Sequence, residues 1–206
     1  MTSICELKKQ CRICGNSKLV KILDLGKMPP ANSFIEKEDL KKNEPSFPLI
    51  LVFCPKCSLV QLAHVVDPDI LFRSYHYLTG ASRPLAEHFV KMAEDIAEKY
   101  VSSKNDLVVE FGSNDGVLLF ALKSKCRVLG VDPAENIAKL AQERGVETIT
   151  DYFSERVAKE ILEKFGPARM IIANNVFAHI DDVHDAMKGI NILLSRSGQF
   201  VFECHW

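Results

Sequence analysis

Two pairs of cysteines constrain the fold of this chain more than any other feature. Cys11 and Cys14 form one Cys-x-x-Cys pair, and Cys54 and Cys57 form the second. A turn of this spacing directs both sulfurs to one side, and four thiolates satisfy the tetrahedral preference of zinc. The pattern therefore predicts a structural zinc site. A redox dithiol, disulfides or four unrelated buried thiols are the alternatives that the same residues allow.

The residues around the cysteines predict a small domain that depends on its metal. About forty residues separate the two pairs, more than in a compact zinc ribbon, so this segment must carry structure of its own. Strands are expected at 19–26 and 47–53, with paired prolines between them. A core of this size seldom holds itself together, and zinc supplies the missing stabilisation. We expect a zinc-binding domain at residues 1–62 that melts first when zinc is lost.

Composition and charge exclude several classes of protein. The chain has 206 residues, 47% of them hydrophobic, which is enough for a full domain and a small one. Its formal net charge of −1, with both signs interspersed, argues against nucleic acid and anionic membranes as partners. No apolar stretch approaches the roughly 20 residues of a membrane span, and the N-terminus has no signal-peptide pattern. Seven cysteines fit a reducing compartment, so we expect a cytoplasmic protein in which Cys5, Cys126 and Cys204 are free thiols.

The remainder of the chain predicts a connector and then an α/β domain. Within residues 63–104, the segment 66–82 has a loop-rich pattern, and apolar residues recur at helical spacing over 84–100. Strands and helices alternate after that. The predicted strands are 106–112, 127–132, 147–150, 170–175 and 198–204, and the predicted helices are 116–124, 135–144, 154–165 and 182–194. This alternation predicts a Rossmann-like parallel sheet of about five strands at residues 105–206, with helices on both faces.

The ends of the first two strands in this domain predict a nucleotide-containing ligand. Gly112 and Gly116 let the backbone turn sharply and bring its amides close to a ligand. Asp132 ends the next strand, where a carboxylate can accept the hydroxyl hydrogens of a ribose. The close glycine pair of a dinucleotide site is missing, and Asp115 would repel a pyrophosphate at this position. S-adenosylmethionine, which has a cationic sulfonium and no phosphate, is therefore favoured over a nicotinamide cofactor.

A series of motifs along almost the whole chain resembles one enzyme family. The motifs are, in order, CRICGNS, LDLGKMPPANSF, FPLILVFCPKCSLVQL, LFRSYHYLTGAS, VVEFGSNDGVLL, GVDPAENIA and NNVFAHI. They are similar to those of the sugar C-methyltransferases, which alkylate nucleotide-linked deoxyketosugars. The resemblance implies a four-cysteine zinc module followed by a class I S-adenosylmethionine-dependent methyltransferase domain, with zinc in a structural role and a nucleotide sugar as substrate.

The resemblance also implies roles for individual residues. The methionine part of the cofactor would be lined by Glu110, Gly112, Asn114 and Gly116. Asp132 would hold the ribose, Asp151 would lie near the adenine, and Asn174 would lie near the sulfonium. The region of Tyr75, Tyr77 and Ser82 would close over the substrate pocket, and His179 would face the reacting sugar.

Methylation of a carbon beside a ketone needs a base, donors for the enolate and a methyl group held in line. His179 is the visible candidate base because it follows a predicted strand end, where ligands bind in open α/β sheets. A capping or solvated histidine is the alternative. Tyr75 and Tyr77 are candidate hydrogen-bond donors to an enolate oxygen, although packing would account for them equally well.

The end of the sequence departs from the family pattern. The family has a seven-stranded sheet and a further C-terminal domain, and its main proton-abstracting histidine lies in a downstream segment with no counterpart here. We therefore expect a truncated sheet whose last strand has an unpaired edge, which favours a homodimer. A non-catalytic module that binds cofactor and zinc, or a methyltransferase with a different small-molecule acceptor, are the alternative functions.

Overall fold

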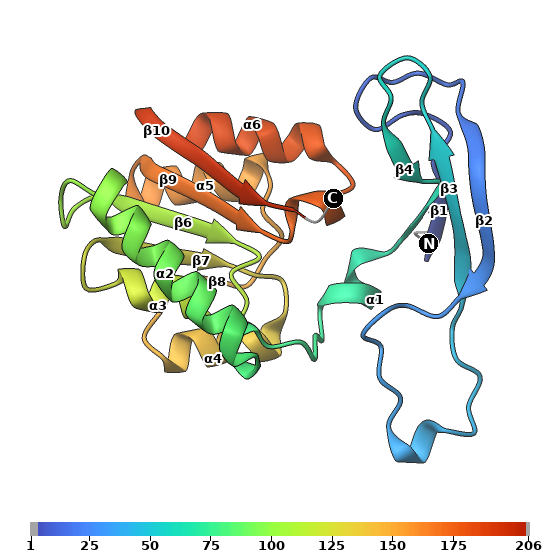
Figure 1. The fold of residues 1–206 in the computed structure, drawn as a ribbon, viewed down its shortest axis with the longest axis horizontal. Coiled ribbons are helices and arrows are strands. Elements are labelled where there is room, and N and C mark those ends of the chain that lie inside the picture. The colour runs from blue at the N-terminus through green and yellow to red at the C-terminus, as the bar shows by residue number, and fades with distance from the viewer. Residues whose placement is uncertain (1–3, 205–206) are drawn as a thin grey trace. The chain divides into compact units, whose positions relative to one another are not determined.

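The computed structural model describes residues 4–204, and its chain divides into two compact units. The first unit is Met1–His76 and the second is Tyr77–Trp206. The division falls inside the stretch 63–104, where the sequence predicts a connector and a helix. Figure 1 shows the first unit as a group of β-strands and the second as a sheet flanked by helices.

The first unit is built from antiparallel strands. A three-stranded sheet has the order β2 (Val20–Met28), β3 (Phe47–Phe53) and β4 (Val60–Leu62). A second, two-stranded sheet pairs β1 (Cys5–Leu7) with β5 (His64–Val66). The strands predicted at 19–26 and 47–53 are confirmed as β2 and β3. The three-residue strands were not predicted, because so few residues show no alternation.

The segment 66–82 is more regular than the loop-rich pattern predicts. It contains the short helix α1 (Pro68–Phe72) and the 3-10 turn η2 (Thr79–Ala81). The Asp67 side chain caps α1 by accepting a hydrogen bond of 3.0 Å from the Asp69 amide, and Pro68 occupies the first turn. The pair Asp67-Pro68 is thus the sequence signal from which this helix could have been predicted. A 3-10 turn, η1 (Lys37–Asp39), lies between β2 and β3.

The first unit has a small apolar core. All nine residues of β2 are exposed, and the buried apolar side chains include Phe47, Val52 and Ala63. Cys11 and Cys54 are buried beside them, with exposed fractions of 3% and 0%. The cysteine cluster therefore occupies the place that a larger apolar core would fill in a bigger domain.

The second unit contains a five-stranded parallel sheet, which confirms the predicted α/β class. Its order is β10-β9-β6-β7-β8. The strands are β6 (Leu107–Phe111), β7 (Arg127–Val131), β8 (Thr148–Ile149), β9 (Ala168–Asn174) and β10 (Leu194–Glu203). The chain runs outward from β6 to β8 and then returns to the other side of β6 as β9. The order thus reverses between β6 and β9, and ligands bind at such a reversal in open α/β sheets.

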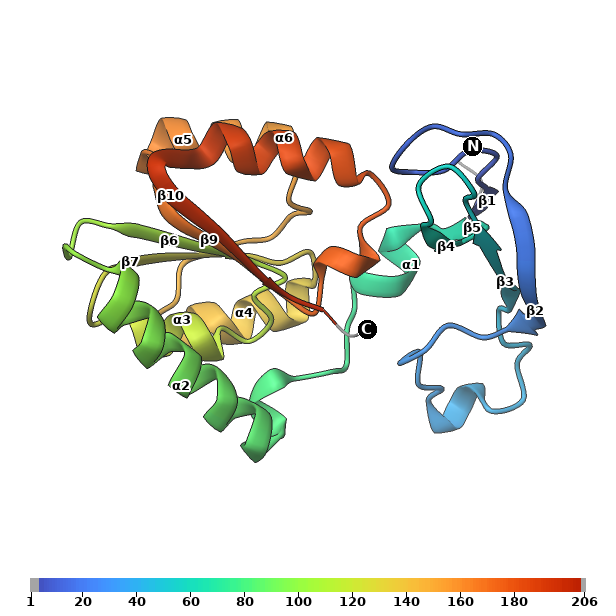
Figure 2. The ribbon, with the colours of Figure 1, turned by 45° about the horizontal axis from the view of Figure 1, so that its top comes forward.

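Helices cover both faces of this sheet (Figure 2). They are α2 (Arg83–Tyr100), α3 (Val117–Leu122), α4 (Glu135–Glu143), α5 (Glu155–Phe165) and α6 (Val183–Leu193). Side chains of α2, α3 and α4 share one buried cluster with Val108, whereas α5 and α6 share the other with Val109. Successive residues of β6 therefore point to opposite faces, and all five are buried.

Strand β10 forms one edge of the sheet among the described residues, and its Phe202 side chain is 54% exposed. Within residues 4–204, no helix combines the length and apolarity that crossing a membrane requires.

Candidate zinc site and cofactor site

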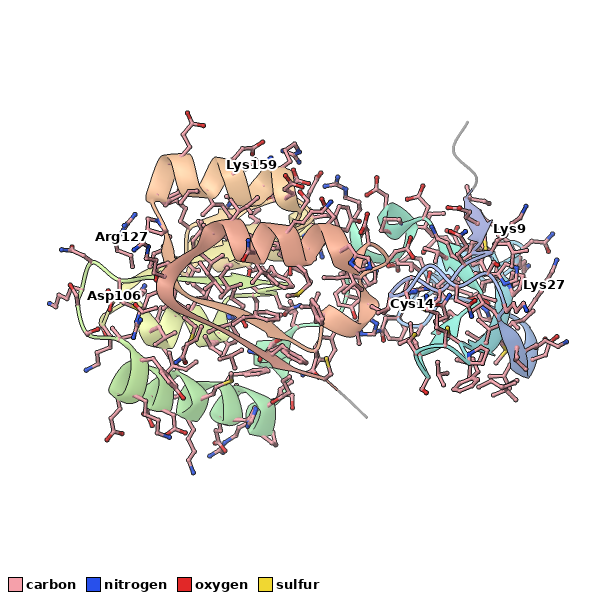
Figure 3. The ribbon with its side chains drawn as sticks, turned by 90° about the horizontal axis from the view of Figure 1, so that it is seen from above. Lys9, Cys14, Lys27, Asp106, Arg127 and Lys159 are labelled. Atoms are coloured by element: carbon pink, nitrogen blue, oxygen red, sulfur yellow. The ribbon has the colours of Figure 1, made fainter. Side chains whose placement is uncertain are left out.

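The four predicted metal ligands come together in the first unit. The sulfur atoms of Cys11, Cys14, Cys54 and Cys57 all lie within 4.8 Å of one another. The Cys11–Cys57 and Cys14–Cys54 sulfur pairs are 3.5 and 3.6 Å apart. A tetrahedral zinc with bonds of about 2.3 Å requires sulfur separations of about 3.8 Å, whereas a disulfide requires about 2.05 Å. The cluster therefore fits zinc and contains no disulfide. Figure 3 labels Cys14 in this unit.

The two cysteine turns have the same backbone geometry. The Gly15 amide donates to the Cys11 carbonyl at 2.9 Å, and the Ser58 amide donates to the Cys54 carbonyl at 2.8 Å. Gly15 and Ser58 both adopt the left-handed conformation, with φ of 68° and 62°. The left-handed conformation strains the backbone of a serine but not that of a glycine. Only the second turn therefore contains backbone strain.

Asn16 connects the two turns. Its Nδ2 donates to Cys54 Sγ at 3.5 Å and to the Lys18 carbonyl at 2.9 Å. Burial raises the pKa of Cys54, but the bonds from Asn16 and from the Lys56 and Cys57 amides outweigh it and lower that pKa to about 6. Cys54 is thus poised as a thiolate, which is the form that binds metal.

Gln61 braces the first turn from β4. Its Oε1 accepts from the Arg12 amide at 3.0 Å, and its Nε2 donates to the Gln10 carbonyl at 3.3 Å. The side chain is buried, so both bonds are protected from water. Sequence reasoning missed Asn16 and Gln61, although Asn16 lies only two residues after Cys14 and could have been considered as a partner for sulfur.

The second unit gathers polar side chains at the carboxyl ends of its central strands. Glu110 lies near the end of β6, Asp132 directly follows β7, and Asn174 is the last residue of β9. Because these three strands are parallel neighbours, their carboxyl ends form one edge. All three side chains are buried, with exposed fractions of 4%, 6% and 8%.

Glu110 and Asn174 form a buried pair with unused acceptors. Asn174 Nδ2 donates to Glu110 Oε1 at 3.2 Å. Glu110 Oε2 and Asn174 Oδ1 are buried and accept no hydrogen bond in the described part of the chain. Burial raises the pKa of Glu110 to about 8, opposed by the Asn174 bond and reinforced by the charges of Asp132 and Asp115. One of these two unsatisfied acceptors belongs to a carboxylate whose ionised form is destabilised by burial. Such a pair suits a cationic donor.

Residues 112–116, the cofactor loop, pass close to this pair. Gly112 and Gly116 are left-handed, with φ of 65° and 73°. A Cβ at Gly112 would lie 2.7 Å from Cβ of Val176, so the loop requires glycine there on two grounds. Asn114 is also left-handed, with φ of 49°. The predicted sharp glycine turn is confirmed.

Asp132 is oriented by the backbone around it. Its two carboxylate oxygens accept from the Asn114 amide at 2.8 Å and the Ala134 amide at 2.9 Å. Burial raises the pKa of Asp132, and these two bonds oppose the rise. Each carboxylate oxygen retains a second lone pair, so the oriented group can still accept from a ligand hydroxyl.

Two family models match the two units. Residues 11–72 match a family described as "putative zinc binding domain", and residues 109–200 match a family described as "methyltransferase domain". The chain combines a zinc-binding domain with a methyltransferase domain. S-adenosylmethionine is the cofactor of the methyltransferase domain, and zinc is the metal of the cysteine cluster.

Two curated proteins that are similar to this chain are named as methyltransferases. The chain is 38% identical, over 195 residues, to the C-methyltransferase NovU of Streptomyces niveus, covering 94% of this chain and 46% of NovU. It is 30% identical to an uncharacterized methyltransferase of Schizosaccharomyces pombe, covering 55% of this chain and 45% of that protein. The chain thus spans about half the length of the curated relatives it matches. The solved structure of Streptomyces venezuelae DesVI aligns with a TM-score of 0.48 and 14% identity, over 64% of this chain and 59% of that chain.

The buried pair at the sheet edge of the methyltransferase domain fits S-adenosylmethionine. The amino group of its methionine part is a cationic hydrogen-bond donor. Glu110 Oε2 and Asn174 Oδ1 have no such donor among the described residues. The fit therefore rests on the donor and acceptor chemistry of the pair as well as on the glycine turn.

Asp115 corrects one step of the sequence argument. Its side chain does not present a charge to a ligand, because Oδ2 accepts from Arg144 Nη1 at 2.7 Å and the side chain is 1% exposed. Arg144 is thus the counterion of Asp115 within the protein. Repulsion of a pyrophosphate by Asp115 therefore does not discriminate between cofactors. The sequence did not reveal the ion pair, because Arg144 lies 29 positions from Asp115.

Asp151 and Asn114 are partly occupied by protein contacts. Asp151 follows β8, where it accepts from the Tyr152 amide at 2.7 Å and pairs with Arg156 Nη2 at 2.6 Å. The Asn114 side chain donates to the Tyr77 carbonyl at 3.1 Å and accepts from the Thr79 amide at 2.8 Å. The side chain of Asn114 is thus held by Tyr77 and Thr79, and its backbone amide is held by Asp132.

The three predicted catalytic residues lie in different parts of the molecule. His179 is exposed in the 3-10 turn η3 (Phe177–His179), which follows β9 in the methyltransferase domain. Tyr77 is the first residue of that unit, and its side chain is 43% exposed. Tyr75 belongs to the first unit, where its hydroxyl accepts from Asn32 Nδ2 at 3.2 Å.

Sequence reasoning missed one polar network at the same sheet edge. Glu203 ends β10, and its carboxylate lies 2.9 Å from His88 Nε2 of α2. The other oxygen accepts from Asn175 Nδ2 at 2.7 Å, which helps to hold Asn175 in a left-handed conformation with φ of 54°. His88 and Glu203 are 115 positions apart, so spacing could not have revealed the pair.

Proposed function

We propose that this protein is an S-adenosylmethionine-dependent C-methyltransferase that alkylates a nucleotide-linked deoxyketosugar. The observation that carries the proposal is the 38% identity to a C-methyltransferase across 94% of the chain, which includes both the zinc-binding and the methyltransferase units. The motif resemblance described above supports the sugar as acceptor. Zinc has a structural role in this proposal, because four protein sulfurs fill its coordination sphere.

The sheet edge would hold the cofactor through three carboxylates and an amide. Glu110 and Asn174 receive the amino group of the methionine part, and Asp132 receives the ribose hydroxyls. We assign Asp151 to the adenine, because it follows β8, one strand further out than Asp132. The cofactor loop contributes the backbone of Gly112, Asn114 and Gly116. S-adenosylmethionine supplies an electrophilic methyl group when it is bound.

The acceptor would be activated by proton removal from the carbon beside its ketone. His179 is the proposed base, because it is accessible and follows the strand that ends in Asn174. An imidazole can accept a proton at neutral pH. Tyr77, which belongs to the same unit as His179, is the proposed donor to the enolate oxygen, and it would stabilise the negative charge as it develops.

Titration calorimetry tests the cofactor part of the proposal. The zinc-loaded chain should bind S-adenosylhomocysteine, and Asp132→Ala should abolish most of that binding while zinc content stays unchanged. Asp95→Ala is the matched control, because Asp95 lies on α2 and pairs only loosely with Lys99 at 3.7 Å. Equal affinity in wild type and Asp132→Ala would disprove the ribose assignment.

A proton-exchange experiment tests the acceptor and the base separately from methyl transfer. A thymidine-diphosphate 4-keto-deoxysugar is incubated with the protein in deuterium oxide, and deuterium incorporation beside the ketone is followed by NMR. Wild type should accelerate exchange, and His179→Ala should reduce that acceleration about a hundredfold or more. Cofactor binding without binding of the sugar would point to a different small-molecule acceptor, and binding of both without exchange or methylation would indicate a non-catalytic module.

A further inference from the structure

Residues 77–80, the joint segment, begin the second unit directly after the chain leaves the first. Their backbone is held by the cofactor loop. The Thr79 amide donates to Asn114 Oδ1, the Tyr77 carbonyl accepts from Asn114 Nδ2, and the Gly80 amide donates to the Asp115 carboxylate at 3.2 and 3.3 Å. Two successive side chains of the cofactor loop thus bind three residues of the joint segment.

Arg144 secures this arrangement from the end of α4. Its Nη1 donates to the Asp115 side chain at 2.7 Å and to the Asp115 carbonyl at 2.9 Å. The Asp115 side chain is 1% exposed, whereas that of Arg144 is 43% exposed. A buried carboxylate without its cation would be strongly destabilised, so Arg144 holds the Asp115 side chain at the position where it accepts from Gly80.

Gly80 leaves the space that this contact requires. A Cβ on Gly80 would lie 2.6 Å from Asp115 Oδ2 and 3.3 Å from Arg144 Nη2. Gly80 does not have a left-handed backbone, so an alanine there is opposed by this contact and not by its own φ angle. Gly80→Ala is therefore a steric probe of the contact between the joint segment and the cofactor loop.

The cofactor loop needs such external support. Three of its five residues are left-handed, and one of them, Asn114, is not glycine. A loop in this conformation persists only when its surroundings determine it. Loops fixed in their binding conformation bind more tightly, because the ligand does not bear the cost of ordering them.

We propose that Asp115 and Arg144 are positioning residues that link cofactor binding to immobilisation of the joint segment. The proposal rests on the S-adenosylmethionine site of the proposed function. When the joint segment is held, the cofactor loop is ordered and binds its ligand. By linkage, a bound cofactor stabilises the same hydrogen bonds and restrains the chain where the two units are joined.

Calorimetry with S-adenosylhomocysteine on the zinc-loaded chain tests the linkage. Gly80→Ala should weaken binding about tenfold, and Arg144→Met should do at least the same. Arg144→Lys retains a cation beside Asp115 and should restore most of the affinity. Arg83→Met is the matched control, because Arg83 lies at the start of α2 in an exposed pair with Glu87 and should leave affinity unchanged.

Hydrogen exchange distinguishes linkage from a purely structural role of this contact, because only linkage makes protection of the joint segment depend on the ligand. In wild type, S-adenosylhomocysteine should slow exchange of the Thr79 and Gly80 amides, and this protection should be lost in Gly80→Ala even at saturating ligand. Unchanged affinity and protection in Gly80→Ala would overturn the linkage and leave the proposed function intact. Absence of binding by wild type would overturn the cofactor site and the linkage together. If Arg144→Met fails to fold, Gly80→Ala decides the question alone.

Discussion

The two units of this chain are stabilised by different means. In the zinc-binding unit, all nine residues of its longest strand are exposed, and in the methyltransferase unit all five residues of β6 are buried. The first unit gathers four sulfurs within 4.8 Å of one another, whereas the second packs helices on both faces of a sheet. A structure of few apolar residues therefore relies on a metal, and a structure with two apolar layers does not.

Removing zinc should produce the largest difference between the units. We expect Cys54→Ser, or chelation of wild type, to unfold the zinc-binding unit because its metal site exists only in the folded state. Hydrogen exchange should then show loss of protection in β2 and β3, with β6 and β9 still protected. Cys126→Ser, in the methyltransferase unit, is the control and should retain zinc. Protected β2 and β3 amides in a zinc-free chain would contradict the comparison.

Glu110 should make the stability of the methyltransferase unit depend on pH. Its pKa is raised from 4.5 to about 8, mainly by burial, so the folded state holds a proton that the unfolded state releases. The stability contributed by this proton is complete below pH 4.5 and is lost as the pH rises to 8, by about 1.4 kcal/mol per unit. Glu110→Gln should therefore match wild type near pH 4.5 and exceed its stability increasingly up to pH 8.

Hydrogen exchange of peptides from β6 and β9 at several pH values measures this effect without depending on the zinc-binding unit. A constant difference between Glu110→Gln and wild type across this pH range would exclude a buried carboxyl with a raised pKa. Saturating S-adenosylhomocysteine should reduce the difference, because its amino group stabilises the ionised carboxylate.

Two isoleucines, one in each unit, allow a direct comparison of the stability that is lost when the side chain is truncated. Ile172 in β9 is fully buried, and Ile22 in β2 is 52% exposed. Ile172→Ala should destabilise its unit by about 3 kcal/mol, through lost burial and the cavity left behind. Ile22→Ala should change the stability of its unit by less than about 0.5 kcal/mol. Urea unfolding of each variant, followed by exchange in the unit concerned, checks both values, and similar losses at the two sites would mean that β2 is covered in solution.

The two cysteine turns provide the finest comparison. Ser58→Gly should stabilise the zinc-bound unit by about 1 kcal/mol, because it relieves a left-handed serine. Gly15→Ser should have the opposite effect of similar size, since a Cβ at Gly15 meets no atom within 4 Å and only its backbone is strained. Competition with a zinc chelator measures both changes. Equal affinities in the two variants would show that the turns tolerate either residue.

Sequence reasoning predicted the methyltransferase unit well because its elements are periodic. The helix over 84–100 and the five strands appear within a few residues of their predicted bounds. The largest difference is β10, which begins at Leu194, four positions before its predicted start. There its pairing with β9 shifts register between Leu194 and Gln199, and the sequence carries no signal of such a bulge.

The parts that could not be predicted depend on residues that are distant in sequence. The cysteine cluster and the glycine turn were predictable, because fixed local spacing determines them. Arg144 has no local feature that marks it as the partner of Asp115, and the raised pKa of Glu110 results mainly from its burial on a strand that lies between β7 and β9. The charge of an isolated residue is therefore a poor guide to its role until its partners are known.

The separation of the two cysteine turns also determines how the zinc-binding unit can fold. Each turn is local and closes within a few residues, but Cys14 and Cys54 are 40 positions apart, with all of β2 and β3 between them. A zinc ion can be captured by one turn before the other arrives, and the slow step is then closure of the intervening loop. Refolding of this unit should accordingly show a fast metal-capture phase followed by a slower phase whose rate depends on the length of the β2–β3 connection and not on the zinc concentration.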